Sequence, residues 1–102
     1  MSQVRENLTA LTGTIEARRP HPALPGHVEV RLRVEGSAPV EGKADLLAPS
    51  AGDVLDVAVP ARLLGEAGVG VTVRLRAGRG TAGWILAEPH PGPGDFGVGK
   101  DS

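Results

Sequence analysis

The stretch His27–Glu35 reads HVEVRLRVE and decides the fold. Every second residue from Val28 to Val34 is aliphatic, and the residues between them are charged. Strict alternation of this kind indicates a β-strand with one face in the core and the other in water. The stretch Val69–Arg76 (VGVTVRLR) has the same pattern, and the side chains expected to face the core are those of Val69, Val71, Val73 and Leu75.

Weaker strand patterns surround these two. We predict further strands at Leu8–Arg19, Gly42–Ala48, Val54–Val59 and Thr81–Ala87. Gly13 is where the first strand is expected to bend, and Gly83 marks an expected bulge in the last one. Glycine and proline predict loops at Arg19–Gly26, Gly36–Pro39 and Pro49–Asp53, and a hairpin turn at Ala77–Gly80.

One short helix is predicted at Pro60–Gly68, because proline is favoured at the first helical position and glycine just past the last. The resulting order favours an all-β fold: a five- to six-stranded antiparallel OB-like barrel, with one short helix between the third and fourth main strands. In such a barrel the helix closes one open end, and Leu63 and Leu64 suit that position. A six-stranded sandwich and an SH3-like barrel are the alternatives.

The chain has 102 residues, which is room for one domain. We expect the barrel to occupy residues 1–88. Residues 89–102 are rich in proline and glycine and lack any periodicity, so they are predicted to form a flexible C-terminal tail.

The composition of the chain excludes several classes of protein. The chain has no cysteine, which excludes a disulfide scaffold and a thiolate metal site. Its 11 basic and 12 acidic residues give a net charge of −1, which argues against a strongly basic nucleic-acid binder. No apolar run approaches the ~18 residues of a membrane span, so we expect a cytoplasmic protein without membrane contact. Only one Trp and one Phe are available for the core, so association into a homo-oligomer, a dimer or tetramer, is expected to help stability.

No catalytic or metal-binding pattern is found. The serines stand in predicted loops or at the ends of the chain, with no nucleophile motif around Ser2, Ser37, Ser50 or Ser102. The chain has three histidines, His21, His27 and His90, and they lack the close spacing that is typical of metal ligands. The sequence therefore predicts a protein that is not an enzyme and has no cofactor and no metal.

The opening stretch Glu6–Pro20 has an Asn, an apolar strand, a Gly, a mixed run and a basic segment before a Pro. In this it resembles the beginning of bacterial single-stranded DNA-binding proteins and their primosomal relatives. The resemblance continues in the loop that ends at Pro25-Gly26 and in the alternating strand Val28–Val34. Further along, Val59–Leu64 resembles the strand-to-helix junction of the family, and Val69–Arg76 and Trp84–Glu88 resemble its last two strands. It spans about Glu6 to Pro89 and implies an OB-fold that binds single-stranded nucleic acid.

The chain departs from that family in three respects. Trp84 is the one aromatic residue within the predicted barrel, whereas the family stacks bases on several. The basic arm between the last two strands is reduced to Ala77–Gly80. The acidic, Phe-tipped C-terminus of the family is absent, since Phe96 is followed by GVGKDS.

Arginine binds phosphates through its planar fork, and tryptophan stacks on bases. The predicted nucleic-acid-binding residues are Arg18, Arg19, Arg31, Arg33, Arg74, Arg76, Arg79 and Trp84. The competing interpretation is that these arginines alternate with Glu29 and Glu35 on an ordinary solvated face, and that Trp84 fills the core or a subunit interface. Binding, where it occurs, is expected to be weak and strongly dependent on salt.

Three functional hypotheses follow. The first is a small OB-fold binding module for single-stranded nucleic acid that acts as a homo-oligomer. The second is an accessory subunit that binds a protein partner through its tail and has no role with nucleic acid. The third is a carrier of lipid or another small molecule, because a barrel of small side chains can leave a cavity.

Overall fold

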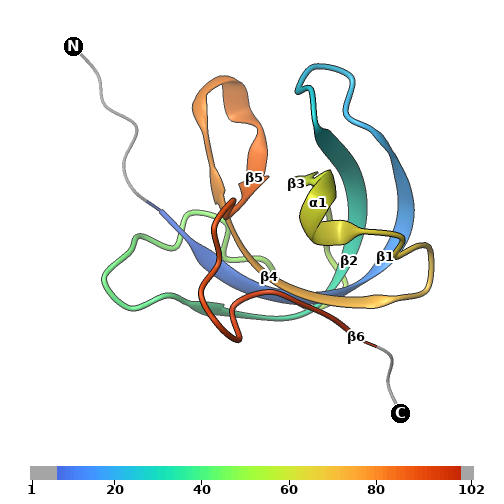
Figure 1. Ribbon diagram of the computed structural model, residues 1–102. Helices are drawn as coiled ribbons and strands as arrows, with labels where there is room; N and C mark the ends of the chain where they lie inside the picture. Colours follow the sequence, from blue (N-terminus) through green and yellow to red (C-terminus); the bar gives the residue numbers. More distant parts are fainter. Residues whose placement is uncertain (1–6, 100–102) are drawn as a thin grey trace.

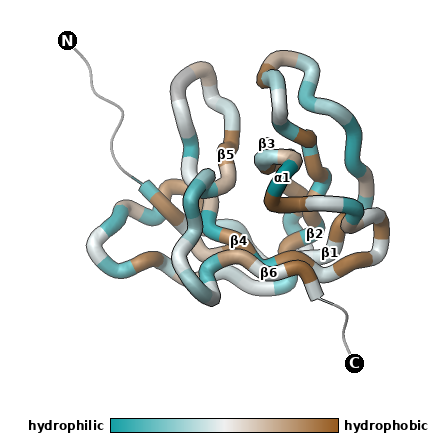
Figure 2. The backbone as a smooth tube through the Cα atoms, viewed as in Figure 1, coloured by the Kyte–Doolittle hydropathy of each residue, from teal (hydrophilic) through white to brown (hydrophobic). Residues whose placement is uncertain are grey.

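The alternating stretch forms strand β2, His27–Pro39, in the computed structural model, which describes residues 7–99 (Figure 1). Its aliphatic side chains Val28, Val30, Leu32 and Val34 are buried, as their spacing predicts. Hydrophobic and hydrophilic residues alternate along the strands (Figure 2). The hydrophobic effect acting on a two-residue repeat therefore sets the orientation of this strand.

The chain continues from β1 (Thr9–Pro20) and β2 into a barrel with one helical insertion. The later elements are β3 (Val54–Pro60), α1 (Ala61–Leu64), β4 (Thr72–Arg79), a 3-10 turn (Thr81–Gly83), β5 (Ile85–Ala87) and β6 (Gly97–Gly99). The strands are hydrogen-bonded in the order β1-β2-β3-β5-β4, and pairing of β1 with β4 closes the ring (Figure 1). The predicted OB-like barrel, with its helix between β3 and β4, is confirmed.

The prediction that the sheet is antiparallel throughout is wrong at one pair. β3 and β5 run parallel, with Val57 opposite Ile85 and Ala58 opposite Leu86. The closed ring has five strands. In a ring with an odd number of strands, the strand direction cannot reverse between every pair of neighbours. One neighbouring pair must be parallel, and here it is the pair whose strands are joined through α1 and β4.

β1 bends as it passes from one side of the barrel to the other, and Gly13 marks the place. The first half of β1 pairs with both β2 and β4, and its register with β2 shifts between Thr12 and Gly13. A Cβ atom on Gly13 would lie 2.4 Å from the carbonyl oxygen of Arg33. The backbones of β1 and β2 therefore approach too closely here for any side chain.

α1 is shorter than predicted. It makes a single turn and ends at Gly65, whose φ of 60° is accessible to glycine at little cost. Leu64 is buried and Leu63 packs on the core, so both close one end of the barrel as expected. Within residues 7–99 no helix is long and apolar enough to cross a membrane.

The predicted β4–β5 hairpin is displaced along the chain. Val69 was expected in the core, but it is 69% exposed, because Gly70 (φ 92°) turns the chain and β4 begins only at Thr72. At the other end, the predicted turn Ala77–Gly80 is mostly strand, and the turn lies at Thr81–Gly83. The expected strand Thr81–Ala87 is reduced to β5, and Gly83 is a turn residue (φ 80°) and not a bulge.

Two predictions between β2 and β3 are also wrong. Gly36–Pro39, expected as a loop, continues β2 because the long β1 pairs with it as far as Thr9. Gly42–Ala48, expected as a strand, makes one isolated bridge, between Asn7 and Ala44. The hydroxyl of the fully buried Thr9 donates to the Asp45 carboxylate at 2.5 Å, which ties this segment to the barrel.

The segment after Pro89 returns to the barrel. β6 pairs with the first half of β4, placing Val98 opposite Val73, and Phe96 packs against the core. β6 is therefore a sixth strand outside the closed ring. The division at residue 88 and the flexibility of residues 89–102 stay predictions, although residues 97–99 lie along β4.

Candidate nucleic-acid interface

Two loops meet at the end of the barrel beside α1. The ring of His21, which begins the β1–β2 loop (residues 21–26), lies against the ring of Trp84, which ends the β4–β5 loop (residues 80–84). The ring centroids are 4.7 Å apart and the planes are inclined at 76°, an edge-to-face contact. Trp84 is half-buried. The contact joins the β1–β2 loop to the β4–β5 loop.

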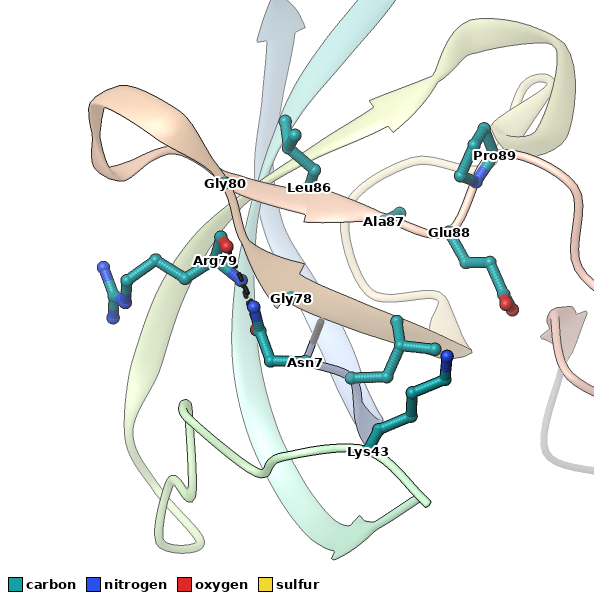
Figure 3. Close-up of a pocket in the computed structure, with 10 residues that line it drawn as sticks. Asn7, Lys43, Gly78, Arg79, Gly80, Leu86, Ala87, Glu88 and Pro89 are labelled. Carbon is teal, nitrogen blue, oxygen red and sulfur yellow. Dashed lines mark hydrogen bonds between the residues drawn. The ribbon is translucent and has the colours of Figure 1, made fainter. Parts of the chain in front are cut away.

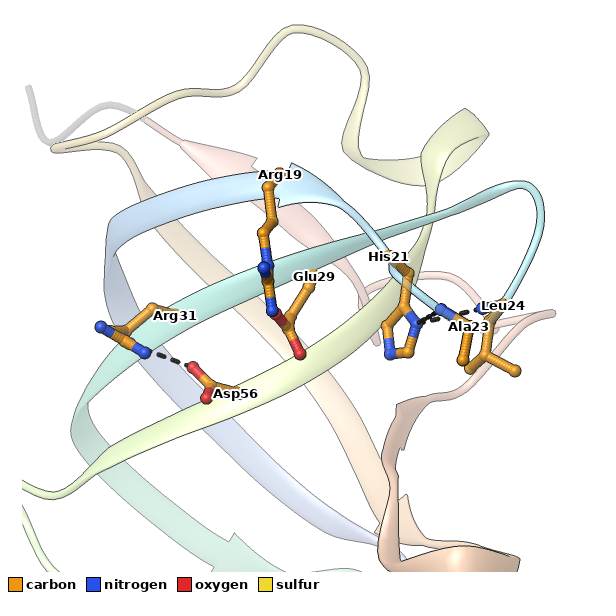
Figure 4. A network of polar contacts seen from close by, with 7 residues as sticks. All are labelled: Arg19, His21, Ala23, Leu24, Glu29, Arg31 and Asp56. Atoms are coloured by element: carbon orange, nitrogen blue, oxygen red, sulfur yellow. Dashed lines mark hydrogen bonds and ion pairs between the residues drawn. The ribbon is translucent and has the colours of Figure 1, made fainter.

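The His21 side chain also organises its own loop. Its Nδ1 atom accepts hydrogen bonds from the backbone N–H groups of Ala23 (3.0 Å) and Leu24 (3.1 Å), as Figure 4 shows. Gly26 takes a φ of 76° and accepts a hydrogen bond from Ala61 N at the start of α1. Local turn bonds and one contact to the helix therefore fix a loop that contains two prolines.

Three of the predicted arginines line one hollow on the outer face of β1, β2 and β3. The hollow has a volume of about 330 Å³, and its lining residues are Ala17, Arg18, Arg19, Glu29, Arg31 and Asp56. Arg19 pairs with Glu29 at 2.7 Å, and Arg31 pairs with Asp56 at 3.1 Å (Figure 4). The hydrogen bond to Asp56 raises the pKa of Arg31 above its ordinary value.

The hollow is close to charge balance. The third guanidinium, of Arg18, donates to the carbonyl oxygens of Gly65 (3.1 Å) and Ala67 (2.5 Å), so it fastens the segment after α1. A phosphate entering the hollow would have to compete with both carboxylates for the other two guanidinium groups. Ion pairs at a protein surface are usually worth only about 0–1 kcal/mol, so an anion of sufficient affinity could displace the carboxylates.

Arg33 lies outside this hollow. Its guanidinium pairs with Glu16 on β1 and lines a neighbouring depression with Thr14, Glu35 and Val69. Its charge is therefore neutralised within the sheet, as are those of Arg19 and Arg31.

The structure does not bring Arg74 and Arg76 into the interface. Arg76 makes two hydrogen bonds to Glu88, at 2.9 and 2.7 Å, and a longer ion pair to Asp95 at 3.4 Å. Hydrogen bonding to Glu88 raises the pKa of Arg76. Arg74 donates to the carbonyl oxygen of Gly94. These two arginines hold the C-terminal segment against β4.

Arg79 lines a different, largely apolar cleft of about 340 Å³ (Figure 3). The side-chain oxygen of Asn7 accepts a hydrogen bond from Arg79 N (2.7 Å), and the side-chain nitrogen of Asn7 donates one to Arg79 O (3.0 Å). These two bonds join the residues just before β1 to the end of β4. The other lining residues are Leu8, Lys43, Gly78, Gly80, Leu86, Ala87, Glu88 and Pro89. The sequence does not reveal this cleft, because the glycines on either side of Arg79 predict a turn there.

Within residues 7–99 no group of three or more His, Cys, Asp or Glu side chains is placed to hold a metal ion. The candidate interface that remains consists of the His21–Trp84 pair and the hollow lined by Arg18, Arg19 and Arg31. No protein-family model, no curated protein and no solved structure matches the chain. The resemblance to single-stranded DNA-binding proteins therefore stays a prediction from the residues that carry it.

Proposed function

We propose that this barrel is a binding module for single-stranded nucleic acid, which it holds at the loop end of the β2–β3 face. The observation that carries the proposal is the His21–Trp84 contact. It places the one tryptophan of the chain where the β1–β2 and β4–β5 loops meet, beside a hollow lined by three arginines. OB-folds bind oligonucleotides with this face and these loops.

Each group has a defined part. Trp84 provides a surface on which a base stacks, a contact worth about 1–3 kcal/mol. Arg19 and Arg31 turn from their carboxylate partners to the phosphates on either side of that base, while Arg18 stays with the segment after α1. Because each phosphate displaces a carboxylate and a single tryptophan is present, binding is weak.

A titration of a fluorescein-labelled oligo-dT, followed by anisotropy, tests the proposal. We expect binding at about 20 mM salt and a loss of roughly 30- to 100-fold in affinity at about 200 mM salt, the effect of releasing two to three phosphate counterions. Trp84→Leu is expected to weaken binding by about 5- to 150-fold. Arg31→Gln should flatten the salt dependence.

Arg74→Gln is the matched control, because Arg74 also lies exposed on a strand but its guanidinium donates to the carbonyl oxygen of Gly94, in the C-terminal segment. It is expected to leave both the affinity and the salt dependence unchanged. A wild-type protein that gives no anisotropy change at low salt would contradict the proposed function.

The module is also proposed to act as a homo-oligomer. β6 stands at the end of the strand order, and its Val98 is 43% exposed. Strand edges of this kind are usually covered, and a second copy can pair with such an edge about a two-fold axis. Light scattering is expected to give about two or four times the chain mass of 10.4 kDa. A single species of the chain mass at high concentration would contradict it.

A second function, that of a protein-interaction subunit, is favoured by the apolar cleft beside Arg79 and by the charge balance of the β1–β3 face. The cleft would take a short apolar segment of a partner protein. The segment after Ala87 contributes Glu88 and Pro89 to it, and Arg62 of α1 donates to the carbonyl oxygen of Pro89. Absence of oligonucleotide binding at low salt would favour this function over the first.

A further inference from the structure

We propose that His21 is a pH-sensitive latch, whose neutral ring holds the β1–β2 loop in place and against Trp84, and whose protonation releases both. The inference concerns the loop end itself and does not require that nucleic acid bind there. Where the proposed function holds, the same latch makes access to Trp84 depend on pH.

The protonation state of His21 follows from its hydrogen bonds. Nδ1 lies 3.0 Å from Ala23 N and 3.1 Å from Leu24 N, and both of these atoms are backbone N–H donors. An imidazole nitrogen accepts hydrogen bonds only through a free lone pair, so Nδ1 carries no proton in this arrangement. The ring is therefore neutral, with its proton on Nε2.

Protonation removes both bonds together. A proton on Nδ1 would point at two N–H groups, so three donors would meet with no acceptor between them. The ring has to rotate away, and its contact with Trp84 at 4.7 Å is lost with it. The remaining loop bonds do not involve the ring: His21 N donates to His27 O, His27 N to Leu24 O, and Ala61 N to Gly26 O. The change is therefore local and leaves the barrel folded.

Among residues 7–99, no carboxylate makes a hydrogen bond or an ion pair to His21 that would hold the charged ring in its present position. The charged groups near it are Arg19 of β1, Glu29 and Arg31 of β2 and Asp56 of β3 (Figure 4), and the nearby elements α1 and β4 also carry Arg62 and Arg79. Asp56 is already paired with Arg31 at 3.1 Å. Glu29 is already engaged by Arg19 at 2.7 Å. The other titratable group is His27, whose Nδ1 faces the carbonyl oxygen of Pro25 at 3.0 Å. A carbonyl accepts a hydrogen bond from a protonated ring, so His27 is not expected to behave as a latch.

Trp84 makes the latch measurable, because the chain has one tryptophan. We expect the fluorescence of the full chain to show a single transition between about pH 8 and pH 5, the range in which histidines titrate, with the emission shifting to longer wavelengths as the contact opens. The far-UV circular dichroism should stay constant through the same range.

His21→Asn is the decisive variant, because an asparagine side-chain oxygen accepts the same turn N–H groups but does not titrate. It is expected to abolish the fluorescence transition, and the matched controls His27→Asn and His90→Asn are expected to retain it. A transition that persists in His21→Asn, or a wild-type protein with no transition, would overturn the inference.

A second measurement on the wild-type chain covers the case in which His21→Asn does not fold. In a pH titration followed by NMR, the amide protons of Ala23 and Leu24 should shift together with the His21 ring, since they lose their acceptor. Amide shifts that do not follow the ring would overturn the latch equally. No oligonucleotide is present in either experiment, so the latch and the proposed function fail separately.

Discussion

Leu32→Ala is expected to lower the free energy of unfolding by about 3 kcal/mol, within the range of 2–5 kcal/mol found when a buried leucine is truncated. Leu32 has no exposed surface and lies in the cluster formed by the inward residues of β1, β2, β3 and β4. The barrel is closed around it by backbone hydrogen bonds, so the strands cannot collapse into the space that the side chain leaves. For a domain of this size the melting temperature should fall by more than about 10 °C.

Leu46→Ala is the matched control, because Leu46 is the same residue type but 47% exposed. It is expected to change the stability by less than about 0.5 kcal/mol. Chemical denaturation followed by circular dichroism measures both variants. Equal losses in the two would mean that Leu32 does not lie in the core.

Gly13→Ala is expected to lower the free energy of unfolding by at least about 2–3 kcal/mol, although it adds only one methyl group. The new Cβ would lie 2.4 Å from the Arg33 carbonyl oxygen and 2.8 Å from Cγ of Leu32. The Arg33 carbonyl belongs to the backbone of β2 and cannot move aside as a flexible side chain can. The strands β1 and β2 would therefore have to separate at the point where their register shifts. Both the bend in β1 and the closure of the barrel depend on that approach.

Gly36→Ala tests whether the cost comes from the close approach or from glycine in a strand as such. Gly36 also belongs to the β1–β2 pair, but a Cβ there meets nothing within 4 Å. Its substitution is expected to be neutral or slightly stabilising, because alanine restricts the unfolded chain. Thermal unfolding of the two variants gives the comparison, and a Gly13→Ala protein as stable as wild type would show that the strands can separate without loss.

The parts of the fold that the sequence predicts are those in which local pattern and tertiary burial agree. The alternation in His27–Val34 requires one buried face, and β2 has it. The helix between β3 and β4 begins next to Pro60 as predicted, but it ends at Gly65 and not at the expected Gly68. The parallel β3–β5 pair is not among these parts, because no residue pattern signals it and an antiparallel barrel is what the sequence predicts.

The errors arise where a distant contact overrides a local preference. Ala77 and Gly78 look like a turn, yet both are buried in β4, because they pair with β5 and Asn7 fastens the adjoining Arg79. Gly36–Pro39 looks like a loop, but it meets the far end of a long β1. Local propensity cannot report a partner some 30 or 70 residues away.

The candidate interface was predictable in its residue types but not in its pairings. Alternation places Arg31 on the outer face, but only the register of β2 against β3 sets it opposite Asp56. The hydrogen bonds of Arg76 depend on the course of the chain after β5, which has no periodic pattern. The role of His21 is not predictable from the sequence, because no neighbouring residue signals that its ring accepts two backbone hydrogen bonds.

The cross-strand pairs on the β1–β3 face have a kinetic consequence. Where each guanidinium has a carboxylate within about 3 Å, as with Arg19 and Arg31, the opposite fields cancel over a distance shorter than the Debye length of about 8–10 Å. A diffusing polyanion then feels no attraction until it collides with the surface. Where the proposed function holds, the association rate constant should therefore stay near the unsteered value of about 10⁵–10⁶ M⁻¹ s⁻¹.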